Sequence, residues 1–387
     1  MQKHSMYSIM ASEGDANNVG CISVEHKYIK HIRKEGCIMK AIVKTGPQPG
    51  VEVVDMPVPT PGPGEVLIKV GAAAICGTDL HYYHWNKSGQ DFGAKYNISW
   101  PLVLGHECAG TIVAAGEGVT ERTVGQRVAL ETHISCGKCF NCENGMPHNC
   151  TDMKIYGTSC NGCFAEYALA PAKVCFVLPD EMTFEEGALL EPTGVSMRAV
   201  EECGVQPGET VVVNGCGPIG MLAAMILKSG NAARVIVTDL DDFRLGMAAR
   251  MGAIPVNAAR EDAVVRVREL CASRGGADVV MECSGAAAAY KSIFQFLRPE
   301  GRLVTVAHPG GEIPINISKD INTRGVAWKG IFGRRIWNTW WNVSSLIAAK
   351  RINVLDVVTH RFTLDQGQEA MALKPQECGK VLFTFDN

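Results

Sequence analysis

Four cysteines lie close together in one short stretch of the sequence. They are Cys136, Cys139, Cys142 and Cys150, with two, two and seven residues between successive members. One loop with this spacing can bring four thiolates around a tetrahedral zinc ion, and four protein ligands leave no open position, so we predict a structural zinc site. An iron–sulfur cluster is the alternative, but the run lacks the repeated cluster pattern with a trailing proline. The density of the four makes unliganded loop cysteines the poorer interpretation.

A second set of metal-binding side chains is spread over a longer part of the sequence. Cys76, His106, Glu107 and Glu191 together offer one thiolate, one imidazole and one or two carboxylates. Three ligands and an open position are typical of a catalytic zinc site, where the metal polarises an alcohol oxygen and lowers its pKa. Taken singly, a cysteine or histidine is more often a core side chain than a ligand. Their combination predicts metal-assisted oxidation of an alcohol, because hydride leaves a carbon more easily once its oxygen has lost the proton.

Two side chains after Cys76 are suited to move the released proton. Thr78 and His81 follow the cysteine by two and five residues. A hydroxyl and an imidazole at these positions predict a proton relay to solvent, with Glu191 as a further catalytic group. The alternative for His81 is an ordinary surface histidine, and for His84 in the same stretch that is the favoured interpretation.

A glycine-rich turn indicates a dinucleotide site. Gly215, Gly217 and Gly220 fit GxGxxG, between a valine-rich strand candidate and an apolar helix candidate. Glycines here let the backbone approach a pyrophosphate, and the helix N-terminus supplies N–H donors to it. Asp239 ends the next strand about 20 residues on, where its carboxylate would bind ribose hydroxyls and repel a 2′-phosphate, which favours NAD over NADP. Arg244 would weaken that preference, and a plain strand–turn–helix is the alternative interpretation.

The surrounding elements divide the chain into four parts. Residues 1–38 are polar and without clear periodicity, so we expect a poorly ordered extension. Short β-rich runs with dense turn signals predict an irregular β-barrel-like domain over 39–187. Alternating strands and helices predict an α/β fold with a doubly wound parallel sheet over 188–335. Residues 336–387 are expected to hold one helix and to return to the first domain. The strand candidates of the parallel sheet are residues 210–213, 234–239, 277–282 and 302–306.

Composition and charge exclude several classes of partner. The chain has 387 residues, with 37 Lys and Arg against 40 Asp and Glu, and hence a formal net charge of −3. That balance predicts no nucleic-acid partner and no anionic membrane surface. No apolar run reaches the roughly 18 residues that span a bilayer, and the N-terminal stretch lacks the apolar core of a secretory signal. With no such signal, 16 cysteines favour metal binding in a reducing, cytoplasmic setting.

The motifs together resemble a known family. CGTD from Cys76, GHE around His106, the four-cysteine loop, LEP around Glu191 and GCGPIG from Gly215 occur in the order seen in the zinc-dependent medium-chain dehydrogenases, over nearly all of residues 39–387. The resemblance implies a GroES-like catalytic domain, an inserted Rossmann domain and an active site in the cleft between them. It also implies NAD and two zinc ions per chain, and a small polar alcohol as substrate.

The same resemblance assigns roles to individual residues. The catalytic zinc ligands that it implies are Cys76, His106 and either Glu107 or Glu191, and the proton relay is Thr78 and His81. A homotetramer or homodimer, formed through the edge strand at 324–331, is a further implication. The NAD-binding positions that match are Gly215, Gly217, Ile219, Gly220, Asp239, Arg244, Val306, Ala307, His308, Ile331 and Phe332.

Two branches of the family fit the chain. The runs 131–134 and 330–334 resemble threonine 3-dehydrogenase, whereas 81–83, 338–340 and 352–354 resemble sorbitol (L-iditol) dehydrogenase. The acidic Trp-x-x-Trp stretch expected after the relay histidine in the threonine branch is missing. The loop from there to the GHE motif is also a few residues longer.

The choice of branch depends on how a zwitterionic substrate would be held. Its ammonium group needs a carboxylate, which Glu191 would supply, and its carboxylate needs a donor, which Arg334 or Arg335 would supply. We expect an activity like that of L-threonine 3-dehydrogenase, with a polyol 2-dehydrogenase of the sorbitol, L-iditol or galactitol type as the alternative. A non-catalytic NAD-binding protein and a zinc-free reductase are more distant alternatives, disfavoured because Cys76 and His106 occur together.

Overall fold

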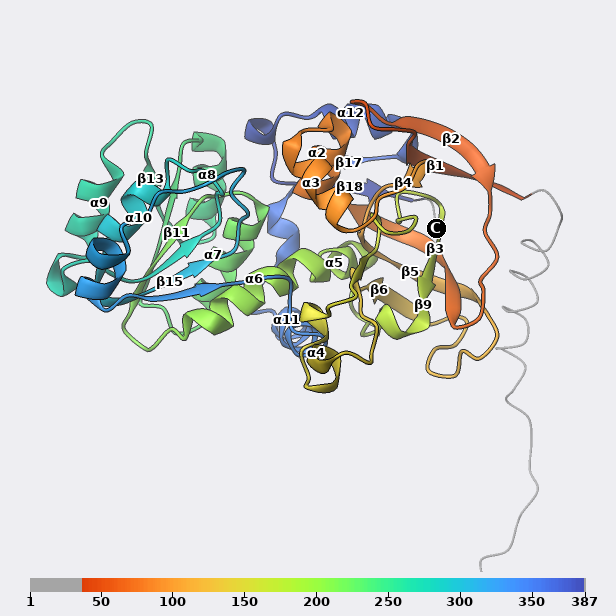
Figure 1. The fold of residues 1–387 in the computed structure, drawn as a ribbon, viewed down its shortest axis with the longest axis horizontal. Helices are drawn as coiled ribbons and strands as arrows, with labels where there is room; N and C mark the ends of the chain where they lie inside the picture. Colours follow the sequence, from red (N-terminus) through yellow and green to blue (C-terminus); the bar gives the residue numbers. More distant parts are fainter. Residues whose placement is uncertain (1–36, 386–387) are drawn as a thin grey trace, which may run out of the picture.

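The computed structural model describes residues 37–385, and the chain forms two lobes joined by packed helices (Figure 1). The predicted N-terminal extension, residues 1–38, lies outside the described residues except for its last two. Within residues 37–385, no helix is long and apolar enough to cross a membrane.

The barrel lobe is built on mostly antiparallel strands. Its seven-stranded sheet has the order β10-β6-β5-β3-β18-β17, with β9 also paired to β3, and a three-stranded sheet has the order β2-β1-β4. Along β3, Val66, Ile68 and Val70 pack into the core of this lobe, whereas the small Ala72 and Ala74 pack against the core that continues into the second lobe. The strands are β1 (Ile38–Lys44), β2 (Glu52–Pro57), β3 (Glu65–Ala74), β4 (Leu102–Val103), β5 (Glu107–Ala115), β6 (Arg127–Leu130), β9 (Tyr167–Pro171), β10 (Cys175–Val177), β17 (Val358–Phe362) and β18 (Lys380–Thr384).

The Rossmann lobe confirms the predicted doubly wound sheet. Six strands lie parallel in the order β13-β12-β11-β14-β15-β16. In β11, Val211 and Val213 pack toward one core cluster and Val212 toward another, so the strand is apolar on both faces, as a parallel sheet covered by helices requires. The strands are β11 (Thr210–Asn214), β12 (Arg234–Asp239), β13 (Ile254–Asn257), β14 (Ala277–Glu282), β15 (Leu297–Thr305) and β16 (Ala327–Gly330).

Helices cover both faces of this sheet and join it to the barrel. One core cluster takes residues from α6, α7 and α8, and the other from α9 and α10. The α11 helix packs on α6, between the two lobes (Figure 1). The helices are α2 (Gly77–His84), α3 (Lys87–Lys95), α4 (Phe140–Glu143), α5 (Phe184–Ala188), α6 (Leu190–Cys203), α7 (Pro218–Ser229), α8 (Asp242–Arg250), α9 (Ala263–Leu270), α10 (Tyr290–Phe296), α11 (Asn338–Ala348) and α12 (Gly367–Ala372).

The last part of the chain returns to the barrel lobe, where β18 pairs with β3 and β17. The prediction of a single helix after residue 336 was incomplete, because α12 follows α11. With only six residues, α12 is too short to show a helical period in the sequence.

Candidate active site

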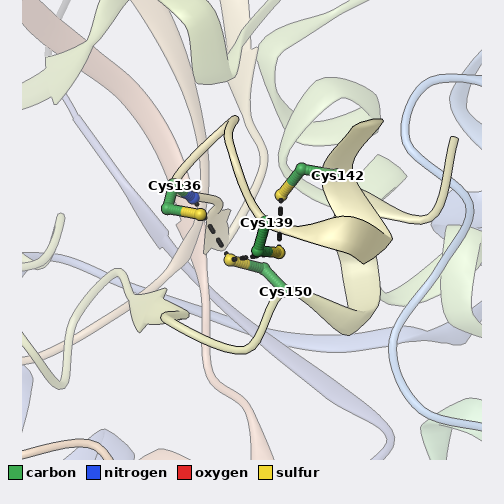
Figure 2. A group of neighbouring side chains, drawn as sticks. All are labelled: Cys136, Cys139, Cys142 and Cys150. Atoms are coloured by element: carbon green, nitrogen blue, oxygen red, sulfur yellow. Dashed lines mark hydrogen bonds between the residues drawn. The ribbon is translucent and has the colours of Figure 1, made fainter. Parts of the chain in front are cut away.

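The four-cysteine loop closes as its spacing predicts. The sulfur atoms of Cys136, Cys139, Cys142 and Cys150 lie within 4.8 Å of one another (Figure 2). Backbone N–H groups, that of Thr151 foremost, lower the pKa of Cys139 to about 5, which favours the thiolate that binds a metal. Four clustered sulfurs fit a tetrahedral structural zinc ion.

A second group of possible ligands lies at the junction of the barrel strands and α2. One ligand atom each from Cys76, His106 and Glu107 lies within 4.8 Å of the others. Asp79 positions the first two: its Oδ2 accepts the Cys76 N–H at 2.9 Å, and its Oδ1 accepts the Gly105 N–H at 3.2 Å and lies 3.6 Å from His106 Nδ1. Although burial opposes it, Asp79 and Cys76 raise the pKa of His106. A thiolate, an imidazole and a carboxylate form a donor set that fits zinc.

Glu191, the fourth predicted ligand, lies in α6 outside this group of three. Its Oε1 pairs with Arg334 Nη1 at 2.6 Å and accepts the hydroxyl of Thr132 at 2.8 Å. It nevertheless lines the same cavity as Cys76 and His106. The structure therefore brings three of the predicted ligands together and places the charge of Glu191 beside them, already paired.

Arg334 is itself held from the opposite side by Glu131. Its Nε donates to Glu131 Oε2 at 2.7 Å and its Nη2 to Oε1, with both side chains at most 1% exposed. Glu131 also accepts from His133 N and Trp340 Nε1, each at 2.8 Å, and its Oε1 lies 2.8 Å from His133 Nδ1. Despite burial, Arg334 and His133 hold the pKa of Glu131 well below its usual range. Glu131 therefore accepts hydrogen bonds from Arg334, Trp340 and the backbone of His133.

This network bears on the predicted clamp for a substrate carboxylate. Arg334 is engaged by Glu131 and Glu191, while Arg335 pairs with Glu202 at the surface, 2.7 Å away. Neither arginine lines the cavity beside the metal ligands. Both guanidinium groups have protein partners away from the cavity lining, so the structure gives no support to the prediction that one of them binds the substrate carboxylate.

Lys380 is a second buried cation that the sequence does not reveal. Its Nζ pairs with Glu107 and donates to the Ile75 carbonyl at 2.9 Å. The lysine begins β18 near the C-terminus and the glutamate begins β5, so their contact depends on how the barrel strands assemble. The ion pair balances the charge of Glu107 and fixes its position beside His106.

These groups open on a cavity of about 230 Å³ between the lobes, which we call the main cavity. Its barrel side holds the metal-binding group and Thr78, and Glu191 of α6 also lines it. Its Rossmann side lies just beyond the carboxyl ends of β15 and β16, where open α/β sheets bind ligands. Thr132 and His133 also line it, although sequence reasoning did not place them in the site; the resemblance of 131–134 to threonine 3-dehydrogenase was the available signal. The predicted NAD-binding residues that line it are Ile219, Val306, Ala307, His308, Ile331 and Phe332.

Thr78 and His81 lie on α2 at different distances from this cavity. Thr78 lines the main cavity, with its hydroxyl 3.9 Å from Cys76 Sγ. His81 lies about one turn further along, toward solvent, and its Nδ1 is 2.9 Å from Asn86 Nδ2. Partial burial, which has the larger effect, and the nearby His84 lower the pKa of His81.

The glycine-rich turn has the shape that a dinucleotide requires. A side chain at Gly215, where φ is +104°, would collide with Ser284, and one at Gly220 would collide with Gly215. The space beside Gly217, the residue that caps α7, is open, so a pyrophosphate can approach there. Asp239 lines the adjoining cavity of about 270 Å³ and accepts the N–H of Cys216 at 2.6 Å.

Arg244, the remaining predicted NAD-binding residue, lies on α8 one turn after the strand that ends in Asp239. Its backbone N–H donates to Asp241 at 2.9 Å, and its carbonyl lies 3.2 Å from Cys216 Sγ. Arg244 is thus held close to the glycine-rich turn.

Replacing Cys139 tests the four-cysteine loop. In Cys139→Ser we expect the loss of one zinc ion per chain and a lower thermal midpoint, because a structural zinc ion contributes its binding free energy to folding. Zinc content by elemental analysis and a melting curve measure both. Cys160→Ser, which changes a thiol outside either ligand group, is the control and should keep both zinc ions. A stable Cys139→Ser protein with full zinc would contradict the assignment.

Two family models match the chain. The alcohol dehydrogenase GroES-like domain matches residues 62–180, and the zinc-binding dehydrogenase model matches residues 218–349. These ranges correspond to most of the barrel lobe and most of the Rossmann lobe.

Individual relatives match over nearly their whole length. The L-threonine 3-dehydrogenase of Pyrococcus furiosus is 39% identical over 348 residues, which cover 89% of this chain and 98% of that protein. A dehydrogenase of Escherichia coli CFT073, solved with NADH, superimposes with a TM-score of 0.77 at 29% identity, covering 90% of this chain and all of that one. The 2R,3R-butanediol dehydrogenase of Bacillus subtilis gives a TM-score of 0.79 at 29% identity, with the same coverage.

Proposed function

The chain belongs to the zinc-dependent medium-chain alcohol dehydrogenase family, and from that premise we propose that it oxidises the secondary alcohol of L-threonine with NAD as hydride acceptor. The observation that carries the proposal is the main cavity, where Cys76, His106 and Glu107 face the carboxyl ends of β15 and β16. Substrate and nicotinamide would meet there. The 39% identity to an L-threonine 3-dehydrogenase supports this substrate.

We propose that Cys76, His106 and Glu107 hold the catalytic zinc ion. When bound, zinc polarises the alcohol oxygen and eases the loss of its proton. The chain's own groups prepare the site for this: Asp79 orients His106 and Lys380 holds Glu107 in place. We propose that the hydroxyl of Thr78, which lines the main cavity, accepts the alcohol proton and passes it toward His81. His81 lies about one turn further along α2, toward solvent, and would receive that proton from Thr78.

Glu191 is the group that we propose for the substrate's ammonium group. Its contacts with Arg334 and Thr132 both use Oε1, so Oε2 is available to a cation in the main cavity. A charge-assisted hydrogen bond there would distinguish a 2-amino alcohol from a simple alcohol. Threonine carries its ammonium group on the carbon next to the one that is oxidised, which suits a carboxylate beside the metal ligands.

A neutral polyol is the second candidate, and one observation favours it. Neither Arg334 nor Arg335 reaches the main cavity, so the arginine clamp expected for an amino acid is missing. The sequence features that resembled sorbitol dehydrogenase give less support. Trp340 donates to Glu131, and the Thr339 hydroxyl donates to the Arg335 carbonyl, so neither side chain lines the main cavity.

We further propose a cytoplasmic enzyme that forms a homodimer or homotetramer through β16. This strand is at the edge of the six-stranded sheet, and its four residues are exposed. An edge strand with unpaired backbone groups can pair with the same strand of a second copy.

The substrate panel and the metal site are tested together. NADH formation is measured with L-threonine, sorbitol, galactitol and 2,3-butanediol, with and without a chelator. We expect chelator-sensitive activity that is highest with L-threonine, and a fall in kcat of about 10³-fold in Cys76→Ser, as the loss of several kcal/mol of metal assistance predicts. NAD binding should persist in that variant, and Cys160→Ser is the matched control. Activity on sorbitol or galactitol alone would support the second candidate instead.

Cofactor choice is tested at Asp239. In Asp239→Ala we expect the KM for NAD to rise by roughly tenfold, because a hydrogen bond to a charged group contributes about 1.5 kcal/mol. The KM for NADP should fall, since the repulsion of its 2′-phosphate is removed. Asp239→Asn keeps an acceptor for the Cys216 N–H and separates the effect of charge from that of loop geometry. If the ratio of the KM values for NAD and NADP is unchanged in both variants, another group sets the preference.

A further inference from the structure

The α3 helix lies in the stretch between His81 and His106 that is longer than expected for the threonine branch. Phe92 of this helix lines the main cavity. Lys95 follows three residues later, so it shares the same face of the helix. Its Nζ lies 5.5 Å from the ring centre of Phe332 and 5.0 Å from that of Tyr96.

A second cavity of about 360 Å³, which we call the side cavity, adjoins the main cavity at Phe332. Lys95 and His148 both line it. His148 is 4% exposed, and within the described residues its Nδ1 has no hydrogen-bond partner. Asp152 is exposed on the same cavity, so an anion would bind on the side of Lys95 and Phe332 rather than beside Asp152.

A substrate carboxylate needs a cation near the main cavity that is not already paired with an acidic side chain. Arg334 is paired with Glu131 and Glu191, and Lys380 is paired with Glu107. Lys95 makes no ion pair with any described carboxylate. It lines the side cavity and not the main cavity, but its Nζ lies over the ring of Phe332, which lines both cavities.

The positive charge of Lys95 acts on a residue that lines the main cavity. Together with burial, which has the larger effect, Lys95 lowers the pKa of His308, a residue of the nicotinamide side. Because the Lys95 ammonium group interacts with His308, it can also attract an anion that is bound beside that residue.

We propose that Lys95 binds the carboxylate of the amino-acid substrate, in place of the arginine that the sequence led us to expect. The substrate would then lie between two charges of opposite sign, with its ammonium group toward Glu191 and its carboxylate toward Lys95. This inference rests on the proposed function, since a neutral polyol has no carboxylate to bind. The longer stretch between His81 and His106 carries α3, and it would thereby supply the residue that binds the carboxylate.

The test compares L-threonine with L-threoninamide, which has the same skeleton and a neutral amide in place of the carboxylate. In Lys95→Met we expect the KM for L-threonine to rise about fivefold, as an exposed ion pair worth about 1 kcal/mol predicts. The KM for L-threoninamide and both kcat values should stay near those of the wild type. Lys95→Arg should retain most of the affinity for L-threonine. Lys87→Met is the control, because Lys87 is on the same helix and is paired with Asp91 at the surface.

The outcomes separate this inference from the proposed function. If the wild-type enzyme oxidises L-threonine but Lys95→Met changes the KM of both substrates equally, or of neither, Lys95 does not bind the carboxylate and the proposed function stands. If the wild-type enzyme oxidises only neutral alcohols, the proposed function fails and the role of Lys95 fails with it.

Discussion

The guanidinium group of Arg334, buried between Glu131 and Glu191, is the interaction on which the active cleft depends. Glu131 follows β6 of the barrel lobe, whereas Arg334 follows β16 of the Rossmann lobe. Trp340 of α11 donates to the same glutamate. A buried charge without its partner is strongly destabilising, so these side chains can be buried only if both lobes are in place. The network therefore fixes the spacing of the cleft walls.

That constraint also decides which groups remain for the substrate. Arg334 is engaged by Glu131 and Glu191 and does not line the main cavity, whereas Glu191 lines it with its position fixed by that pairing. The same principle holds at the metal ligands, where Lys380 pairs with Glu107 and Asp79 ties Cys76 to the backbone before His106. Cys76, Glu107 and Glu191 are thus each held by a second, buried residue of the protein.

Much of the site could be predicted because its signals are local in sequence. The cysteine spacing, the glycine-rich turn and the valine-rich strands each depend on residues close together in the chain, and the structure brings the corresponding atoms together. The contacts that were missed join distant residues: Glu131 and Arg334 are 203 positions apart, and Glu107 and Lys380 are 273 apart. No periodicity or motif encodes such pairings, since they arise only when the lobes assemble. For the same reason the sequence could not show that Arg334, proposed with Arg335 as a donor to the substrate carboxylate, is engaged by Glu131 and Glu191.

A double-mutant cycle on Glu131 and Arg334 tests the central claim most directly. The free energy of unfolding is measured for Glu131→Gln, Arg334→Met and the double variant, with Arg335→Met as a control that should change it by less than about 1 kcal/mol. Each single change at the buried pair should cost about 3–5 kcal/mol, because it leaves a charge buried without its partner. If the pair governs the cleft, the double variant will be more stable than the sum of the single effects predicts, by about 2 kcal/mol or more. Effects that add within about 0.5 kcal/mol would show that the two residues act independently, and would contradict the account.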